Sequence, residues 1–369
     1  MRKTRLLIPL SCLLTLSIVL TCTSCGTPSF SAGQQRQMQD IVEKAMAAES
    51  IPGAIVGVWT PDGVWVKSFG KADVETGAAM NTGDGVRIAS NTKTFTATVL
   101  LQIVQEGKLS LDDKLVKYVP SVKDAGNITI RQDLQMTSGT YNFTEDQGFE
   151  EQFDADPLMK ITPEQEIAIA NKHDNYFPPG QGYHYSDTNY EIAGLVIEKV
   201  TGNTMEEEIR TRIIEPLGLS DTSFPQTPDI SGRHSQGYIL KDGKLVDYTR
   251  VDPSVPWAAG AMISNLADMK AWSQSLAAGS LLDDRMHAEQ TKTVKTGIGA
   301  TEYGLGVIEM DGFWGHTGAI FGYNSIFLRD PKRDATFVVL VNKSTNDSSE
   351  AAGIAGGLMK LIYPGLGKK

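Results

Sequence analysis

The chain has 369 residues, with 34 Lys and Arg against 44 Asp and Glu, which gives a formal charge of −10. This acidity argues against nucleic acid as a partner, since phosphate binding requires a clustered basic surface. The cysteines Cys12, Cys22 and Cys25 all lie at the N-terminal end, so neither a disulfide-stabilised fold nor a cysteine-ligated metal site is expected. A hydrophobic content of 41% and a charged content of 21% are typical of a globular chain.

The first residues have the pattern of a secretory signal peptide. Arg2, Lys3 and Arg5 precede an apolar run from Leu6 to Leu20. This run is too short and too interrupted by polar residues for a comfortable membrane span. The alternative is a single anchoring helix.

The end of this apolar run, residues 21–26, resembles a bacterial lipoprotein processing site. Cys25 fits best as the lipidated first residue of the mature chain, although Cys22 occupies a position where the pattern usually has an aliphatic residue. We therefore expect a signal peptide over 1–24 and a flexible tether over 25–36. The resemblance implies an exported lipoprotein, anchored on the outer face of a bacterial membrane in the periplasm or at the cell surface.

The next part of the chain predicts helices and a β-hairpin. Apolar spacing and turn residues give a helix over 37–50, strands over 54–60 and 64–69, a short strand over 85–89 and a helix over 91–106. Pro61-Asp62-Gly63 forms the hairpin turn, and Gly107 ends the second helix. That helix is apolar on most sides, which predicts a central, buried position.

Residues 115–235 are predicted to be mainly helical, with long loops, and strands return near the C-terminus. The main predicted elements are a loop over 143–156, a helix over 189–200, a hairpin with strands over 323–328 and 336–341, and a helix over 349–362. The predicted loop contains six acidic residues and no basic one, so it is either a docking surface or simply a solvated loop.

Because strands lie near both ends of the chain, the pattern predicts an α/β fold with a mainly antiparallel sheet flanked by helices. One lobe would comprise about 37–115 and 236–369, and a mostly helical lobe of about 116–235 would be inserted between its two parts. An active site is expected in the cleft between the lobes.

The first chemical motif is Ser90-Asn91-Thr92-Lys93 at the start of the predicted central helix. Residues three apart share one face of a helix, so the Lys93 amine can lie against the Ser90 hydroxyl. A desolvated lysine has a lowered pKa and can deprotonate a serine nucleophile. The pair is therefore a candidate for nucleophilic catalysis.

Two further motifs are weak alone and informative together. Tyr185, in a loop before the helix over 189–200, can relay a proton if a nearby cation lowers its pKa. His316, Thr317 and Gly318 precede the C-terminal hairpin. If they lie on an edge strand, Gly318 lets a substrate backbone approach, His316 and Thr317 supply hydrogen-bond donors, and the amide of Ala319 points into the cleft.

These motifs resemble the serine β-lactamase-like hydrolases, which include class C β-lactamases, D-alanyl-D-alanine carboxypeptidases and related esterases. The resemblance covers about residues 37–365 and includes VRIASNTKTFTATVLLQIVQEGKLSLDD, FPPGQGYHYSDTNYEIAGLVIEKVTG and GHTGAIFGYNS. Because the third motif is His-Thr-Gly, the chain is most similar to the Streptomyces-type carboxypeptidase. The resemblance implies the β-lactamase/DD-peptidase-like fold.

The resemblance also implies site residues. Ser90 would be the acylated nucleophile, and Lys93 its base, sharing the proton with Tyr185. The backbone N–H groups of Ser90 and Ala319 would form the oxyanion hole. Five residues would contribute to substrate binding besides Gly318: Asp187, His316, Thr317, Trp257 and Phe321.

Three positions depart from the family pattern. Asp187 stands where the family usually has Asn, and a carboxylate there can pair with Lys93 and shift the base role towards Tyr185. The segment after Tyr303-Gly304-Leu305-Gly306 lacks the Arg that grips a substrate carboxylate. Met136 replaces a usual His. The missing Arg weakens the case for carboxypeptidase specificity most.

The leading interpretation is a metal-free serine hydrolase, without a cofactor, that forms an acyl-enzyme with D-Ala-D-Ala-type peptides, such as a peptidoglycan stem peptide, or with β-lactams. An esterase or amidase outside cell-wall chemistry is the nearest alternative, and a lipid-anchored binding or sensor module without turnover is another. A metal enzyme is disfavoured because the histidines lack ligand spacing. These are His173, His184, His234, His287 and His316.

Overall fold

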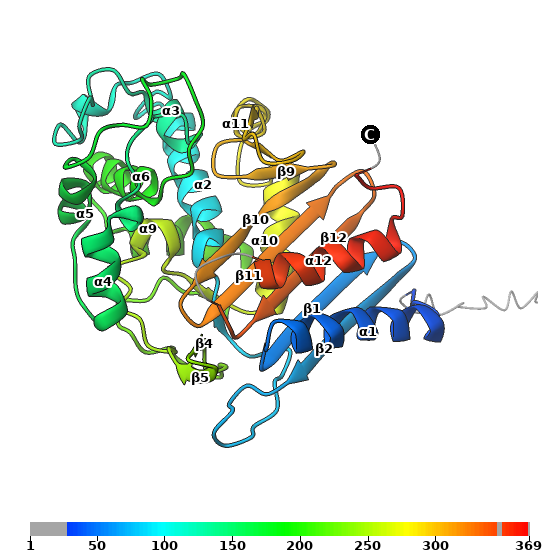
Figure 1. Cartoon of the computed structure of the whole chain (residues 1–369). Coiled ribbons are helices and arrows are strands. Elements are labelled where there is room, and N and C mark those ends of the chain that lie inside the picture. The colour runs from blue at the N-terminus through cyan, green and yellow to red at the C-terminus, as the bar shows by residue number, and fades with distance from the viewer. Residues whose placement is uncertain (1–27, 345–348, 368–369) are drawn as a thin grey trace, which may run out of the picture.

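The computed structural model describes residues 28–344 and 349–367, so the predicted signal peptide and Cys25 lie outside the described residues. Its centre is an antiparallel sheet with the strand order β2-β1-β12-β11-β10-β9-β8-β7 (Figure 1). The strands are β1 Gly53–Thr60, β2 Gly63–Gly70, β7 Val294–Lys295, β8 Glu302–Tyr303, β9 Ile308–Met310, β10 Phe313–Ile320, β11 Tyr323–Asp330 and β12 Ala335–Val341. The predicted α/β fold, with a sheet built from both ends of the chain, is confirmed.

Both faces of this sheet are covered by helices. Ala54 and Val56 of β1 pack in one apolar cluster with α1 (Ala32–Ala48) and α12 (Ser349–Ile362), whereas Ile55 between them belongs to the cluster on the other face. This alternation follows from the two-residue period of a strand. Figure 1 shows α1 and α12 side by side across the sheet.

The first helix begins earlier than the sequence pattern predicts. α1 starts at Ala32, because the Ser31 hydroxyl accepts a hydrogen bond from the Gln34 backbone N–H and the Gln34 side-chain oxygen accepts one from the Ser31 backbone N–H. This capping box satisfies N–H groups that have no partner within the helix. The predicted tether over 25–36 is therefore wrong for residues 32–36, which are helical.

The second layer is mostly helical and surrounds the central helix α2. Its helices are α2 Thr92–Gln105, α3 Ile130–Leu134, α4 Gln147–Ala155, α5 Pro163–Ala170, α6 Asp187–Thr201, α7 Met205–Ile209, α8 Glu215–Leu217, α9 Trp257–Gly260, α10 Leu266–Ala278 and α11 Asp284–Gln290. Shorter pieces are the 3-10 helices η1 Ala89–Asn91, η2 Leu115–Lys117 and η3 Phe143–Glu145, the π-helix η4 Arg210–Ile214, and the strand pairs β3 Val86–Arg87 with β6 Ile263–Ser264 and β4 Tyr238–Lys241 with β5 Lys244–Asp247. As predicted, α2 is buried along nearly its whole length.

The predicted acidic loop over 143–156 is wrong, because most of this segment is helical. Asp146 caps α4 by accepting a hydrogen bond from the Phe149 backbone N–H at 2.8 Å. Phe149 and Phe153, four residues apart, form the buried face of α4, and its acidic side chains lie on the exposed face.

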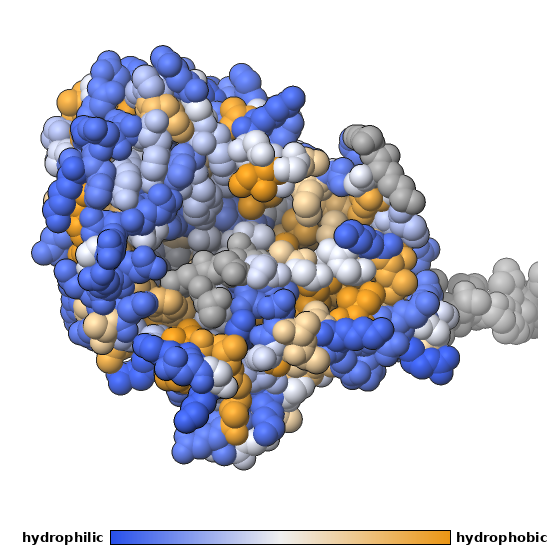
Figure 2. Space-filling view, viewed as in Figure 1, coloured by the Kyte–Doolittle hydropathy of each residue, from blue (hydrophilic) through white to orange (hydrophobic). Residues whose placement is uncertain are grey.

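The outer surface is mainly hydrophilic. In Figure 2, hydrophilic residues dominate the helical side of the molecule, and apolar residues occur in scattered patches, as is normal for a globular protein. Within the part of the chain that the structure describes, no helix is both long and apolar enough to span a membrane.

Candidate active site

Ser90 lies where a short strand turns into the central helix. After β3, Ala89 adopts a left-handed backbone with φ of 48°, and η1 then carries Ser90 to the start of α2. This conformation costs a non-glycine residue about 1–2 kcal/mol. One turn further on, Lys93 Nζ lies 2.9 Å from Ser90 Oγ. The strand-to-helix turn therefore brings the predicted nucleophile and base into hydrogen-bond contact.

Lys93 is fully buried and has three hydrogen-bond acceptors around its amine. Nζ contacts Ser90 Oγ, Asp187 Oδ1 at 2.6 Å and the Ala259 carbonyl oxygen at 3.0 Å. Burial lowers the pKa of Lys93, while the Asp187 carboxylate acts in the opposite direction, and burial is the larger effect. A lysine in this state loses its proton more readily than one in water. The predicted contact between Asp187 and Lys93 is present.

Tyr185 lies beside this pair. The Lys93 Nζ is 4.9 Å from the centre of the Tyr185 ring. Burial and the charge of Asp187 raise the pKa of Tyr185 well above its usual value, against a smaller lowering by Ser90. The phenol is therefore neutral at physiological pH. This direction is opposite to the expected lowering by a cation, so Lys93 is the better candidate for the base and Tyr185 is suited to passing on a proton.

His316 lies on β10 and is buried behind the cleft. Burial, together with the nearby Lys93 charge, lowers its pKa to about 3, so the imidazole is neutral. Its Nδ1 lies 2.5 Å from the Thr317 carbonyl oxygen, and its Nε2 lies 3.1 Å from the Tyr303 hydroxyl. A neutral imidazole has one N–H, so Nδ1 donates to the carbonyl and Nε2 accepts from Tyr303. The expectation that His316 donates to substrate is therefore wrong in this arrangement.

A cavity of about 270 Å³ opens beside Ser90. Asp187 and Ala319, both predicted as site residues, line it together with Ser90. The other lining residues are Ala89, Phe143, Thr144, Phe149, Glu150, Phe153, Val255, Pro256, Ala259, Gly260, Ile320 and Phe321. The lining contains two carboxylates, Asp187 and Glu150, and no lysine, arginine or histidine.

One wall of this cavity is aromatic. Phe321, predicted to line the pocket, stacks on Phe153 of α4 with ring centres 5.1 Å apart. Phe153 in turn stacks on Phe149, which meets Phe143 edge to face at 4.9 Å. The i and i+4 spacing of Phe149 and Phe153 was visible in the sequence, but the acidic residues between them favoured the loop interpretation.

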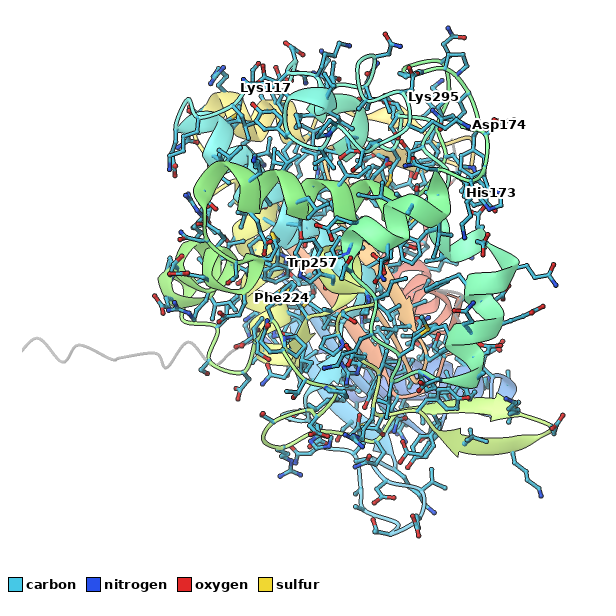
Figure 3. The ribbon with its side chains drawn as sticks, turned by 90° about the vertical axis from the view of Figure 1, so that its left-hand side faces the viewer. Lys117, His173, Asp174, Phe224, Trp257 and Lys295 are labelled. Atoms are coloured by element: carbon cyan, nitrogen blue, oxygen red, sulfur yellow. The ribbon has the colours of Figure 1, made fainter. Side chains whose placement is uncertain are left out.

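Trp257 and Gly318 have different roles from those predicted. Trp257, labelled in Figure 3, is half-buried and is absent from the cavity lining. It packs over Gly194 of α6, where a Cβ atom would come within 2.6 Å of the indole. At Gly318, a Cβ atom would come within 2.2 Å of the Ile88 carbonyl oxygen. Gly318 thus allows β10 to pack against the segment before Ser90, and its missing side chain does not face a substrate.

Thr317 and Ala319 lie on a segment of β10 that has a free side, as predicted. β9 pairs with β10 only at residues 313–315, so on that side the rest of β10 has no strand partner among the described residues. Thr317 is half-buried and is not part of the cavity lining. Ala319 does reach the cavity, on the wall shared with Ser90. Both residues of the predicted oxyanion hole, Ser90 and Ala319, thus line the cavity.

The aromatic wall is fastened to the neighbouring loop by two histidine–carboxylate contacts. His173 Nε2 lies 2.8 Å from Asp146, the capping residue of α4, and His184 Nε2 lies 3.0 Å from Glu145. Figure 3 shows His173 at the end of α4. The His173 ring also stacks on Tyr141 at 3.9 Å. We call these contacts the η3–α4 clasp.

Within the described residues, no group of three or more His, Cys, Asp or Glu side chains is arranged to hold a metal ion. Two groups that support the site were not predicted from the sequence. Tyr303, noted only as part of YGLG, hydrogen-bonds His316, and the Ala259 carbonyl contacts Lys93. Tyr303 lies 13 residues from His316 and Ala259 lies 166 residues from Lys93, so neither contact follows from a local sequence pattern.

Comparison with known proteins agrees with this geometry. Residues 38–357 match the family model described as Beta-lactamase. The chain belongs to the beta-lactamase family. Protein flp of Staphylococcus aureus (strain N315) is 27% identical over 330 residues, or 84% of this chain and 63% of that protein. The chain thus spans less than two thirds of that relative's length.

Two further relatives of this beta-lactamase family member are informative. The putative penicillin-binding protein PbpX of Bacillus subtilis (strain 168) is 27% identical over 282 residues, covering 76% of this chain and 68% of that protein. A solved structure of a D-stereospecific amidohydrolase from Streptomyces sp. is 33% identical, with a TM-score of 0.79 and coverage of 87% of this chain and 98% of the other. The fold is therefore that of β-lactamases and penicillin-binding proteins, and its members include serine hydrolases.

Proposed function

We propose that this protein hydrolyses amides or peptides of D-amino acids that carry an apolar side chain, through an acyl-enzyme on Ser90. The observation that carries the proposal is the buried Lys93 amine, held against Ser90 Oγ by Asp187 and the Ala259 carbonyl. The similarity to a D-stereospecific amidohydrolase supports the choice of substrate.

The reaction follows from the positions of these groups. Lys93 takes the Ser90 proton while Oγ attacks the substrate carbonyl carbon and forms a tetrahedral intermediate. The backbone N–H groups of Ser90 and Ala319 would stabilise its oxyanion. The Lys93 ammonium, through the neutral Tyr185 phenol, then protonates the leaving amine as the C–N bond breaks. Water attacks the acyl-enzyme by the reverse sequence, which releases the acid and restores Ser90.

The cavity lining favours this substrate class over a free C-terminal carboxylate. Its two carboxylates, Asp187 and Glu150, attract the ammonium of an amino-acid amide and repel a carboxylate. His316 is neutral and cannot replace the missing Arg as a cation. The aromatic wall favours an apolar side chain. A D-Ala-D-Ala carboxypeptidase or a β-lactamase is the second candidate, supported by the family and by the similarity to PbpX.

The predicted signal peptide and Cys25 lead us to propose further that the reaction takes place outside the cytoplasm, on a membrane-anchored enzyme. The acidic side chains on the exposed face of α4 still fit the alternative of a binding or sensor module, and detection of an acyl-enzyme that turns over would exclude it.

A substrate panel tests the proposal. The purified protein is incubated separately with D-Phe amide, L-Phe amide, a peptide ending in D-Ala-D-Ala, a fluorescent penicillin and a p-nitrophenyl ester. We expect ammonia release from D-Phe amide, much less from L-Phe amide, and none with Ser90→Ala. Faster cleavage of the D-Ala-D-Ala bond, rapid penicillin turnover, or ester hydrolysis without amide hydrolysis would each overturn the amidase assignment.

A further inference from the structure

Two carboxyl groups are buried near Lys93, outside the cavity lining, and take no part in the proposed reaction. Glu191 on α6 and Glu166 on α5 are both fully buried. Glu191 Oε1 accepts a hydrogen bond from the Ala259 backbone N–H at 3.2 Å. The other Glu191 oxygen and both Glu166 oxygens have no hydrogen-bond partner among the described residues. Neither residue lines the cavity, so neither meets the substrate there.

Two ionised carboxylates cannot both be stable in this environment. Burial raises the pKa of each group, and the Glu191 charge raises that of Glu166 further. The two helices pack against each other. Protonation of one group removes one of the two buried charges, and Glu191 Oε1 can accept the Ala259 N–H in either protonation state.

The Ala259 peptide connects Glu191 to the reaction centre. Its N–H donates to Glu191, and its carbonyl accepts from Lys93 Nζ. A neutral lysine amine has two N–H bonds and one lone pair. When Asp187 and the Ala259 carbonyl accept the two N–H bonds, the lone pair faces Ser90 Oγ. The orientation of the Ala259 peptide therefore determines whether Lys93 can take the Ser90 proton.

We propose that Glu191 is a positioning residue that holds the Ala259 peptide so that the Lys93 lone pair faces Ser90. The inference rests on the proposed acyl-enzyme mechanism and concerns only the orientation of its base. Glu191 acts through Ala259 and does not touch the reacting atoms.

Three substitutions separate this role from a contribution to folding. Glu191→Leu removes the acceptor of the Ala259 N–H, whereas Glu191→Gln keeps an oxygen acceptor and removes the carboxyl group. Glu198→Leu is the matched control, because Glu198 lies two turns further along α6 and also accepts a backbone N–H, from Met205 at 2.9 Å. It has no connection to Lys93.

The measurement is covalent labelling of Ser90 by a fluorophosphonate. The rate constant of labelling reports how readily Ser90 Oγ attacks, and the final labelled fraction reports how much of the protein is folded and reactive. Glu191→Leu is expected to lower the rate constant by about 10- to 100-fold while the final labelled fraction stays near that of the wild type. Glu191→Gln and Glu198→Leu are expected to stay within about threefold of the wild type.

Two results for Glu191→Leu would overturn the inference without affecting the proposed function. One is a wild-type rate constant for Glu191→Leu, and the other is a loss confined to the labelled fraction, which marks a folding defect. If the wild-type protein is labelled elsewhere than Ser90, or not at all, the proposed function fails and the inference falls with it. Failure of Glu191→Gln to restore the rate would contradict the role given to the Ala259 acceptor.

Discussion

Asp187 stabilises the charged form of the proposed base. Its Oδ1 lies 2.6 Å from Lys93 Nζ, and its charge opposes the lowering of the Lys93 pKa by burial. Lys93 must be neutral to accept the Ser90 proton, so activity rises with pH through the pKa of Lys93. A carboxylate at this position therefore moves the acidic limb of the pH profile to higher pH.

Asp187→Asn is expected to shift that limb to lower pH by about one to three units, since an adjacent opposite charge changes a pKa by that amount. Measuring kcat/KM against pH for the wild type and the variant tests this. Asp174→Asn is the control, because Asp174 is fully exposed and pairs only with Lys123 among the salt bridges of the described residues. An unchanged limb, or a shift to higher pH, would contradict the role of Asp187.

The η3–α4 clasp determines how firmly the aromatic wall is held. Asp146 caps α4 through one oxygen and contacts His173 through the other. These contacts lower the pKa of Asp146. A lowered carboxyl pKa contributes stability that is present above the unfolded value near 4 and is lost as the pH falls through the folded value. The wall should therefore loosen only in acid, below about pH 4.

Asp146→Ala removes both the cap and the histidine contact, whereas Asp146→Asn keeps an oxygen for the cap. We expect Asp146→Ala to cost about 1 kcal/mol of local stability. Hydrogen exchange over 143–155 should be faster in the alanine variant than in the asparagine variant, with a raised KM for substrates with large side chains. Equal exchange in the two variants and the wild type would show that the cap does not hold the wall.

The elements also show what can be read from one sequence. The helix over 349–362 and the two hairpins were predicted correctly, because apolar periodicity and turn residues are local signals. The start of α1 at Ala32 was missed, although Ser31 and Gln34 have the spacing of a capping box. Helix α4 was missed, although Phe149 and Phe153 have the i and i+4 spacing of a buried helix face.

At the scale of the whole molecule, the site forms where the sheet meets the helical layer, and prediction from sequence was least complete there. Ser90, Lys93 and Asp187 were identified because their motifs are short. The Glu191–Ala259–Lys93 path and the His316–Tyr303 contact depend on how separate helices and strands pack together. Burial, which makes His316 neutral, is a property of the folded chain and has no signature in a single sequence.

Gly318 lies at this junction between β10 and η1. A Cβ atom there would lie 2.2 Å from the Ile88 carbonyl oxygen and 3.1 Å from Nδ2 of the Asn91 side chain. Relief of this clash requires the sheet and the start of α2 to move apart. Ser90 and Ala319, which line the cavity from the two sides of the junction, would then lose their relative placement.

Gly318→Ala is therefore expected to lower the acylation rate by about 100-fold, as misplacement of reacting groups by about 1 Å can do, and to destabilise the fold by about 1–3 kcal/mol through overpacking. Gly353→Ala is the matched control, because a Cβ atom at that position of α12 meets nothing within 4 Å. That variant should be as active as the wild type and slightly more stable, since alanine favours helix over glycine. Thermal unfolding and fluorophosphonate labelling measure both effects. A Gly318→Ala protein with the wild-type labelling rate would show that the junction tolerates separation and that the placement of Ser90 against Ala319 does not limit acylation.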